Sequence, residues 1–243
     1  MLSQAEKGGV QNTIQNCVTV LQNDPILADS IRLNLLSERI DIVKPMGWQR
    51  SGPTLTDTDM MYILRRMEKY GLYSEKRVSA AIRIVANENH YHPIRDYLNK
   101  LKWDGTARIN RALHRFLGAA EDELTTEALK IFLLGAIKRV FHPGCKFEMM
   151  LCLVGGQGAG KSSFFRLLAI KDEWFSDDLR RLDDDNVFRK LQGHWIMEMS
   201  EMIATANAKS IEEIKSFLSK QKETYKIPYE THPADRLRQC VFA

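Results

Sequence analysis

The sequence contains few cysteines and no long hydrophobic run. Four of its 243 residues are cysteines, and no two of them form a C-x-x-C pair. We therefore expect neither a cysteine-based metal site nor a disulfide framework, and we interpret the four thiols as reduced core residues. The longest apolar run, residues 131–137, is far shorter than the roughly 20 residues that a membrane-spanning helix needs.

An export signal and a strong charge bias are missing as well. The N-terminal segment MLSQAEKGGVQNT lacks the charged-then-apolar layout of a signal peptide, so we predict a soluble protein inside the cell with no membrane partner. The formal net charge of +4 is too mild to argue by itself for a nucleic-acid partner. The hydrophobic content of 44% is sufficient for a sizeable core in one large or two small domains.

The centre of the chain carries a glycine-rich motif. An apolar run, residues 149–154, is followed by Gly155, four further residues, Gly160, Lys161 and Ser162, and then by apolar residues at helical spacing. This is the pattern G-x-x-x-x-G-K-[ST], which is typical of a phosphate-binding loop between a strand and a helix. The alternative is a glycine-rich loop without a ligand.

Phosphate binding requires these residue types at this spacing. Gly156, Gly158 and Gly160 let the backbone curl so that successive N–H groups point at an anion. The following helix directs its positive end to the same place, Lys161 would reach the β- and γ-phosphates, and the Ser162 hydroxyl would bind Mg²⁺. We therefore predict that ATP and Mg²⁺ are bound by the following residues: Gly155, Gly156, Gln157, Gly158, Ala159, Gly160, Lys161, Ser162 and Ser163.

A second motif supplies candidate acids. Residues 195–197 are apolar and precede Glu198, with Glu201 three positions further on. Nucleotide hydrolases with this loop need a neighbouring strand that ends in an acid and a group that orients the attacking water. We predict catalytic roles for Lys161, Glu198 and Glu201 and assign Glu198 with Ser162 to the magnesium ion. The spacing does not decide which glutamate does which job, and both could instead be exposed ends of a helix.

The remaining pattern predicts two regions. Residues 1–144 are interpreted as a mostly helical module, with an extended stretch at residues 33–43 and a long helix at residues 121–141 whose last turn contains Lys138 and Arg139. Residues 145–243 are interpreted as the nucleotide-binding core. The aspartates between Asp177 and Asp185 are read as a solvated face in preference to a metal cluster.

Two further stretches allow a nucleic-acid role. The helix at residues 108–117 carries Arg108, Arg111 and Arg115; we favour a solvated face there over a surface that follows a phosphate backbone. Residues 220–236 form a polar excursion rich in Lys, Tyr and Pro before an apolar segment, residues 237–243, that resembles the start of a buried strand.

Taken with these motifs, the chain resembles the virulence-associated protein E family from about residue 30 to its end. The shared elements are HPIRDYL at 92–98, LKWDG at 101–105 with Arg108, PG at 143–144, KF at 146–147, GGQGAGKS at 155–162, WIMEMSE at 195–201, the segment 215–229 and the final strand at 238–242. The resemblance implies an α/β P-loop NTPase core (RecA/AAA+-like) after a mostly α-helical domain. It also implies an ATPase of a phage, prophage or mobile genetic island, related to superfamily III helicases, that unwinds DNA in the bacterial cytoplasm as a ring-forming homo-oligomer.

The resemblance also implies where DNA contacts lie, and this sequence differs from the family pattern in two respects. Related helicases place a DNA-touching hairpin within the 220–236 excursion, which makes Lys226 and His232, together with Tyr225 and Tyr229, the candidate nucleic-acid residues. The alternative is that this loop is an ordinary solvated connection. Glu223 and Lys226 stand where the family more often has Asp and Arg, and the expected G-T-[TS]-N motif and downstream arginine are not in the sequence. We therefore expect a C-terminally truncated core. A nucleotide-binding module with little turnover that acts through protein interaction, and a P-loop small-molecule kinase, remain the alternatives.

Overall fold

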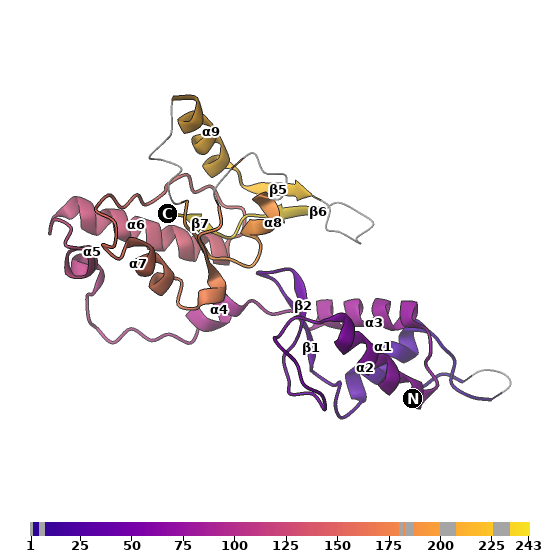
Figure 1. Ribbon diagram of the computed structural model, residues 1–243. Coiled ribbons are helices and arrows are strands. Elements are labelled where there is room, and N and C mark those ends of the chain that lie inside the picture. The colour runs from indigo at the N-terminus through magenta and orange to yellow at the C-terminus, as the bar shows by residue number, and fades with distance from the viewer. Residues whose placement is uncertain (1, 5–7, 180–181, 183–186, 200–207, 226–233) are drawn as a thin grey trace. The chain divides into compact units, whose positions relative to one another are not determined.

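The chain divides into two compact units in the computed structural model (Figure 1), which describes residues 2–4, 8–179, 182, 187–199, 208–225 and 234–243. The units are Met1–Asp96 and Tyr97–Ala243. Residues 97–144, which were grouped with the N-terminal helical module by sequence, therefore lie in the second unit. The reason is packing: their two long helices place Phe116 beside Phe164, and Phe132 beside Phe165, on the helix that follows the glycine-rich loop.

The first unit is mostly helical, with one antiparallel strand pair. The strand pair, with Ile31 opposite Ile42, confirms an extended backbone at residues 33–34 and 39–42 of the predicted stretch 33–43, whereas residues 35–38 form a turn. In chain order the elements are α1 (Ile14–Asn23), β1 (Ile31–Asn34), β2 (Arg39–Ile42), α2 (Asp57–Met67), the 3-10 helix η1 (Glu68–Tyr70) and α3 (Glu75–Glu88), with α4 (Pro93–Leu98) at the boundary of the two units.

Polar caps and an apolar core hold this unit together. Thr13 caps α1 by accepting a hydrogen bond from the Asn16 amide, and Thr56 and Asp59 form a reciprocal capping box on α2. The apolar faces of α1, α2 and α3 meet in one cluster that includes Leu21, which is fully buried. The 3.6-residue spacing of apolar side chains therefore specified these helices correctly.

The second unit mixes helices with short strands. In chain order its elements are α5 (Ile109–Leu117), α6 (Glu123–Phe141), α7 (Lys161–Leu168), the 3-10 helix η2 (Asp172–Trp174), β3 (Phe175–Ser176), α8 (Val187–Leu191), β4 (Ile196–Met197), α9 (Ala208–Ser219), β5 (Lys222–Tyr225), β6 (Ala234–Leu237) and β7 (Val241–Phe242).

A parallel sheet lies at the centre of this unit. Its strand order is β3-β4-β7, and Met150 adds a parallel bridge to Phe242 beyond β7. Every residue of β4 and β7 is buried, as expected for a parallel sheet covered on both faces. Because the strands are parallel, the segments that leave their carboxyl ends meet at one edge of the sheet, where α/β proteins bind ligands.

The apolar run at residues 149–154 was expected to be a full strand, and this prediction is wrong in extent. Only Met150 pairs with the sheet, through the single bridge to Phe242. The neighbouring strand β7 is two residues long, so it has few backbone groups to offer. Val154 is also 99% exposed, because the chain has already left the sheet there to begin the glycine-rich loop.

Arg139 on α6 has a different role from the one predicted. It was interpreted as a cation favoured at the end of a helix, but its side chain is fully buried. Its guanidinium donates to the Cys240 carbonyl oxygen at 2.9 Å and to the Phe147 carbonyl oxygen at 2.7 Å. Arg139 therefore ties α6 both to the residue before β7 and to the segment that leads into the glycine-rich loop.

The polar excursion at residues 220–236 contains an antiparallel hairpin. Strands β5 and β6 pair with Lys222 opposite Leu237. The buried carboxylate of Glu223 forms an ion pair with Arg238, which is also buried. The pair fixes the hairpin to the segment that enters β7, even though Glu223 departs from the expected Asp.

None of the helices in the described part of the chain combines the length and the apolar character that a membrane crossing requires.

Candidate functional site

The glycine-rich loop forms an exposed curl at the start of α7. Gly158 and Gly160 have φ values of 79° and 81°, which are strained for any residue with a Cβ atom. Gly155 and Gly156 have ordinary φ values, and no atom lies within 4 Å of the position that a Cβ would occupy there. The conformational need for glycine is thus confirmed at Gly158 and Gly160 but not at Gly156.

The lysine of the motif lies over this curl. Lys161 is the first residue of α7, and its Nζ donates to the carbonyl oxygens of Gly155 at 2.9 Å and Gly156 at 2.8 Å. These bonds close the loop on itself and leave the ammonium group at the mouth of the curl. The first N–H groups of a helix have no partner within the helix, so the loop and the start of α7 combine backbone donors with a positive charge.

The two motifs predicted from the sequence meet at one contact. The Ser162 hydroxyl donates to Glu198 Oε1 at 2.6 Å, although the two residues lie 36 positions apart. Glu198 directly follows β4, and its backbone N–H donates to the Ser176 carbonyl oxygen at 2.8 Å, which fixes it at the carboxyl edge of the sheet. The reading of Glu198 as an exposed end of a helix is therefore wrong.

Only one of the two carboxylate oxygens of Glu198 is hydrogen-bonded within the described residues. The residue is buried, with 8% of its surface exposed, yet Oε2 has no hydrogen-bond partner among the described residues. A buried carboxylate oxygen without a partner is costly unless another group binds it. Hard oxygen donors such as a carboxylate and a hydroxyl are the ligands that Mg²⁺ prefers, so Ser162 and Glu198 fit the ion that the motif implies.

Aromatic side chains set the position of α7. Phe164 and Phe165 are buried. Phe164 packs against Phe116 of α5 with ring centroids 6.5 Å apart, and Phe165 packs against Phe132 of α6 at 5.9 Å. Burying two aromatic rings anchors the helix while its amino end stays open to solvent.

Sequence comparison identifies the second unit. The profile of the virulence-associated protein E-like domain matches residues 98–243, which is more than half of the chain. The chain belongs to the virulence-associated protein E-like family. The match covers the WDG element, the glycine-rich loop and Glu198, whereas the HPIRD segment at residues 92–96 lies outside it.

A solved structure shares the fold of this VapE-like chain. It is described as the A form apo structure of the NrS-1 C-terminal region, and it aligns with a TM-score of 0.53 at 14% sequence identity. The alignment covers 93% of this chain and 55% of the other, so the chain spans about half the length of the structure it matches. No curated protein matches the chain.

Several predicted site residues of the VapE-like chain are not tested by the geometry. Gln157, Ala159 and Ser163 lie exposed in the loop or first turn of α7. Glu201, Lys226, Tyr229 and His232 lie outside the described residues, as do the aspartates at 183–185. Among the residues that are described, no group of acidic, histidine or cysteine side chains could hold a metal ion by itself.

Sequence reasoning missed Arg139, which helps to position the loop of the VapE-like domain. By holding the Phe147 carbonyl oxygen, it fixes the segment that precedes Met150. A signal was present, because an arginine inside an otherwise apolar helix has to find buried acceptors or reach solvent. Its position one turn from the end of α6 made a role at the helix terminus the simpler interpretation.

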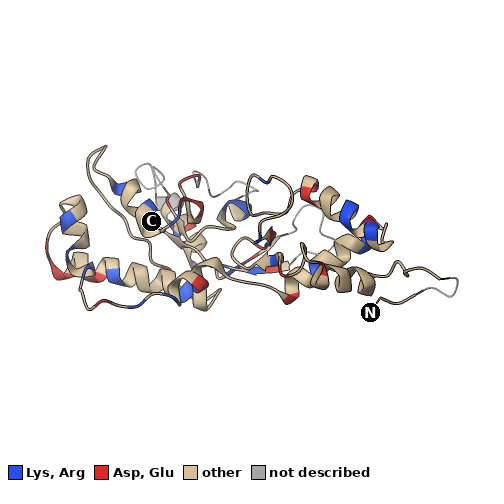
Figure 2. Ribbon diagram, turned by 90° about the horizontal axis from the view of Figure 1, so that it is seen from below, with Lys and Arg blue, Asp and Glu red and all other residues tan. Residues whose placement is uncertain are grey.

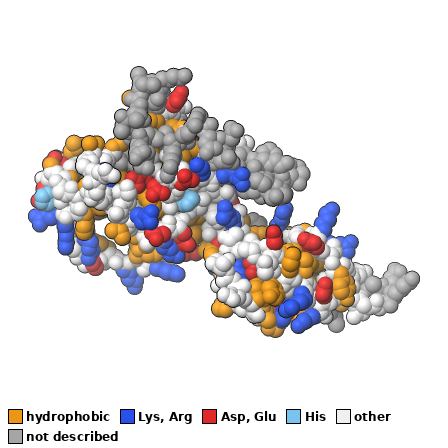
Figure 3. Space-filling model, in the orientation of Figure 1, with side chains coloured by type: hydrophobic (Ala, Val, Ile, Leu, Met, Phe, Trp, Pro, Cys, Tyr) orange, Lys and Arg blue, Asp and Glu red, His pale blue; other side chains and the backbone are white. Residues whose placement is uncertain are grey.

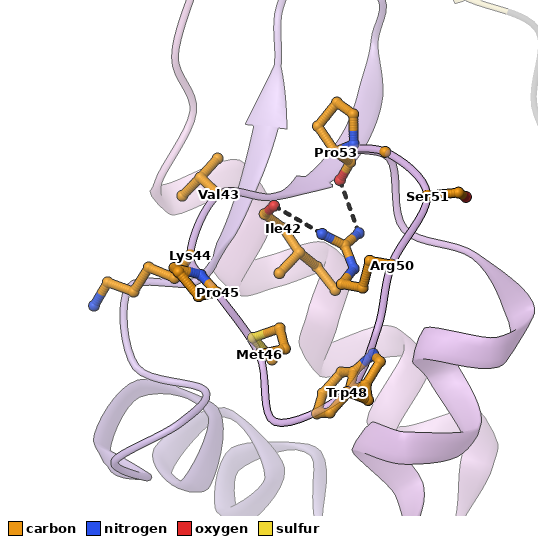
Figure 4. Close-up of a pocket in the computed structure, with 10 residues that line it drawn as sticks. Ile42, Val43, Lys44, Pro45, Met46, Trp48, Arg50, Ser51 and Pro53 are labelled. Atoms are coloured by element: carbon orange, nitrogen blue, oxygen red, sulfur yellow. Dashed lines mark hydrogen bonds between the residues drawn. The ribbon is translucent and has the colours of Figure 1, made fainter.

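The first unit contains a cavity of about 570 Å³ between residues 42 and 53 (Figure 4). The Arg50 guanidinium lies at its wall and donates to the Ile42 and Pro53 carbonyl oxygens, shown as dashed lines, and to both oxygens of Asp59. Trp48 Nε1 also donates to Asp59, at 2.8 Å. Arg50 and Trp48 at this cavity therefore already bond to Asp59 and to carbonyl oxygens of the loop, and they serve its stability.

Proposed function

We propose that the chain is an ATP-binding P-loop ATPase that acts as a DNA helicase in the replication of a phage, prophage or mobile genetic island. Residues 155–163 would surround the triphosphate, with Lys161 at the β- and γ-phosphates. Ser162 and Glu198 would hold Mg²⁺, which neutralises charge on the transferred phosphoryl group. Glu201 would orient the attacking water. Family membership and the fold match support this function.

The contact between Ser162 and Glu198 carries the proposal. In P-loop NTPases, the serine that ends the G-x-x-x-x-G-K-[ST] motif and an acid at the end of a neighbouring strand hold one magnesium ion. The structure joins them at 2.6 Å and leaves the second oxygen of Glu198 without a partner among the described residues.

Two side chains of the motif would exchange their present hydrogen bonds for contacts with the ligand. Binding of the phosphates requires the Lys161 ammonium to leave the Gly155 and Gly156 carbonyl oxygens and turn to the anion. The Ser162 hydroxyl likewise gives up its hydrogen bond to Glu198, which frees both oxygens for the ion or its water. These changes would not require α7 to move, because Phe164 and Phe165 anchor it to α5 and α6.

Nucleotide binding is the first test. Titration calorimetry with MgATP should show binding by the wild type and no measurable binding by Lys161→Ala. Ser162→Ala should bind ATP but lose the dependence on Mg²⁺. Lys171→Ala is the matched control, since Lys171 is an exposed lysine just beyond α7. Undiminished MgATP binding by Lys161→Ala would remove the assignment.

Turnover separates the proposed motor from its alternatives. We expect ATP hydrolysis that single-stranded DNA stimulates. Binding without turnover, with or without DNA, would favour a nucleotide-binding module that acts through protein interaction. Phosphate transfer from ATP to a nucleoside would instead establish a P-loop kinase.

Assembly forms part of the same proposal. Motors of this kind hydrolyse ATP at interfaces between subunits, so we propose a homo-oligomeric ring in the full-length protein. Analytical ultracentrifugation with and without a non-hydrolysable ATP analogue would test this: a monomer under both conditions would contradict ring formation by this chain.

A further inference from the structure

The most exposed tryptophan of the molecule lies in the segment between α4 and α5. The chain has four tryptophans. Trp174 and Trp195 are buried and Trp48 is half-buried, whereas Trp103 is 81% exposed. Exposing an indole to water forgoes a large gain from burial. An indole presented in this way is a candidate contact for a partner.

The surrounding turn holds Trp103 in place. Asp104 accepts hydrogen bonds from the Thr106 amide at 3.0 Å and from the Arg108 guanidinium at 2.9 Å. Gly105 supplies the positive φ of 83° that the turn requires. Hydrogen bonds lower the pKa of Asp104, chiefly the one from Arg108 and to a smaller extent the one from Thr106. The carboxylate is therefore charged at physiological pH and keeps the turn closed.

The charge around this turn is strongly positive. From Tyr97 to Leu117 the chain carries five Lys and Arg residues and one acid, Asp104. Arg108 pairs with Asp104 and Arg111 pairs with Glu121. Lys100, Lys102 and Arg115 are exposed and form no ion pair within the described chain. Figures 2 and 3 show Lys and Arg in blue along this part of the second unit.

We propose that the segment from Lys100 to Arg115, which comprises the Trp103 turn and most of α5, binds single-stranded DNA: Trp103 stacks on an unpaired base while Lys100, Lys102 and Arg115 contact phosphates along the same strand. An exposed aromatic ring and exposed cations in one short stretch of chain are the combination that sequence-tolerant single-strand binders use. A protein partner with an apolar face would leave the three cations without counter-charges, and a duplex keeps its bases stacked out of reach.

This surface is connected to the phosphate loop through α5. Phe116 near the end of α5 packs on Phe164 of α7, and Leu117 Cδ2 lies 3.9 Å from the position that a Cβ would occupy on Gly160. A strand bound on α5 therefore contacts an element that borders the glycine-rich curl. The proposal rests on the proposed function only for the choice of DNA as the nucleic acid, and it can be tested without ATP.

Fluorescence of the full chain provides the test. Addition of the oligonucleotide dT20 without nucleotide should quench the red-shifted emission of Trp103, and anisotropy of labelled dT20 should report binding. Trp103→Ala should weaken binding about tenfold, since stacking on one aromatic ring has that order of effect. Trp103→Phe should lose less, because it keeps a ring. Tyr73→Ala, which removes another exposed aromatic side chain, should bind as the wild type does.

Salt dependence tests the cations. Three phosphate contacts predict that the logarithm of affinity falls with the logarithm of salt concentration with a slope of about −2, and the double variant Lys100→Ala/Lys102→Ala should reduce this slope to about −0.7. Lys69→Ala/Lys76→Ala removes two exposed lysines from the first unit and should leave the slope unchanged.

The outcomes separate this proposal from the nucleotide site. Lys161→Ala should bind dT20 as the wild type does in the absence of ATP. Wild-type affinity in Trp103→Ala, with no quenching by dT20 in the wild type, would overturn the stacking surface even if MgATP binding is confirmed. So would a Trp103→Ala variant that loses self-association and keeps its affinity for DNA, because the indole would then be a protein contact.

Discussion

Asp24 in the first unit and Glu198 in the second are both buried carboxylates, but their oxygens are engaged in different ways. In the first unit, Asp24 accepts hydrogen bonds from Arg66, Tyr70 and the amides of Ile26 and Leu27. In the second, Glu198 is bonded through Oε1 to Ser162, and its Oε2 has no partner among the described residues.

The difference distinguishes a structural carboxylate from one that is available to bind. A fully satisfied buried ion is strongly tied to its surroundings, and removing its charge leaves partners unpaired. A half-satisfied one contributes less to stability and retains capacity for a ligand. The comparison therefore predicts that the same chemical change, carboxylate to amide, will affect folding at Asp24 and activity at Glu198.

The largest effect is expected at Glu198. Glu198→Gln should lower ATP turnover about a thousandfold, because the amide lacks the negative charge that the carboxylate would offer to Mg²⁺. The midpoint of urea unfolding should stay close to that of the wild type, since the amide oxygen can still accept from Ser162. Steady-state phosphate release and circular dichroism would measure the two quantities. A large loss of stability without a loss of turnover would reverse the comparison.

The counterpart in the first unit is Asp24→Asn. Breaking a buried, hydrogen-bonded ion pair should cost about 3 kcal/mol of unfolding free energy. Amide hydrogen exchange should show the loss in α1, whose C-cap residue is Asp24, and in α2, which carries its partner Arg66. Turnover measured below the unfolding midpoint should be unaffected. Unchanged protection of both helices would show that the hydrogen bonds of Asp24 do not stabilise this unit.

Acid should destabilise the first unit in a gradual way. Burial alone would raise the pKa of Asp24, but hydrogen bonds from Arg66, Tyr70 and two backbone amides lower it from 3.8 to about 2. A lowered native pKa gives stability that is complete above pH 4 and is lost as the pH falls from about 4 towards 2.

Asp59 should act in the same direction. Burial opposes the shift there too, and hydrogen bonds from Arg50, Trp48 and Thr56 lower its pKa. Thermal melts between pH 5 and pH 2 would check the prediction, with Asp24→Asn as the control that should show a shallower pH dependence. Stability of the first unit that stays constant over this range would contradict the assignment.

The smallest effect concerns packing near the loop. A Cβ added at Gly135 on α6 would lie 2.1 Å from the Phe147 ring, so we expect Gly135→Ala to destabilise the second unit by about 1–2 kcal/mol. The alanine would otherwise favour the helix. Adding Phe147→Leu should recover much of the loss in a double-mutant cycle of urea unfolding. Independent, additive effects would show that the ring moves aside freely.

Local sequence patterns determined much of this protein. Apolar spacing specified the helices, Thr56 and Asp59 specified a cap, and the glycine-rich motif identified the loop with its lysine and serine at the start of α7. These features depend on neighbours a few residues apart, so short-range sterics and hydrogen bonding are enough to fix them. The strand before Glu198 was recognisable for the same reason.

Tertiary structure decided the rest. Only packing across the sheet could bring Ser162 to Glu198, bury Arg139 against the Cys240 and Phe147 carbonyl oxygens, and shorten the strand at residues 149–154 to one bridge. The assignment of α5 and α6 to the second unit follows from contacts of Phe116 and Phe132 with α7. Such partners are distant in the chain, and their free energy is gained only when the whole unit closes around them.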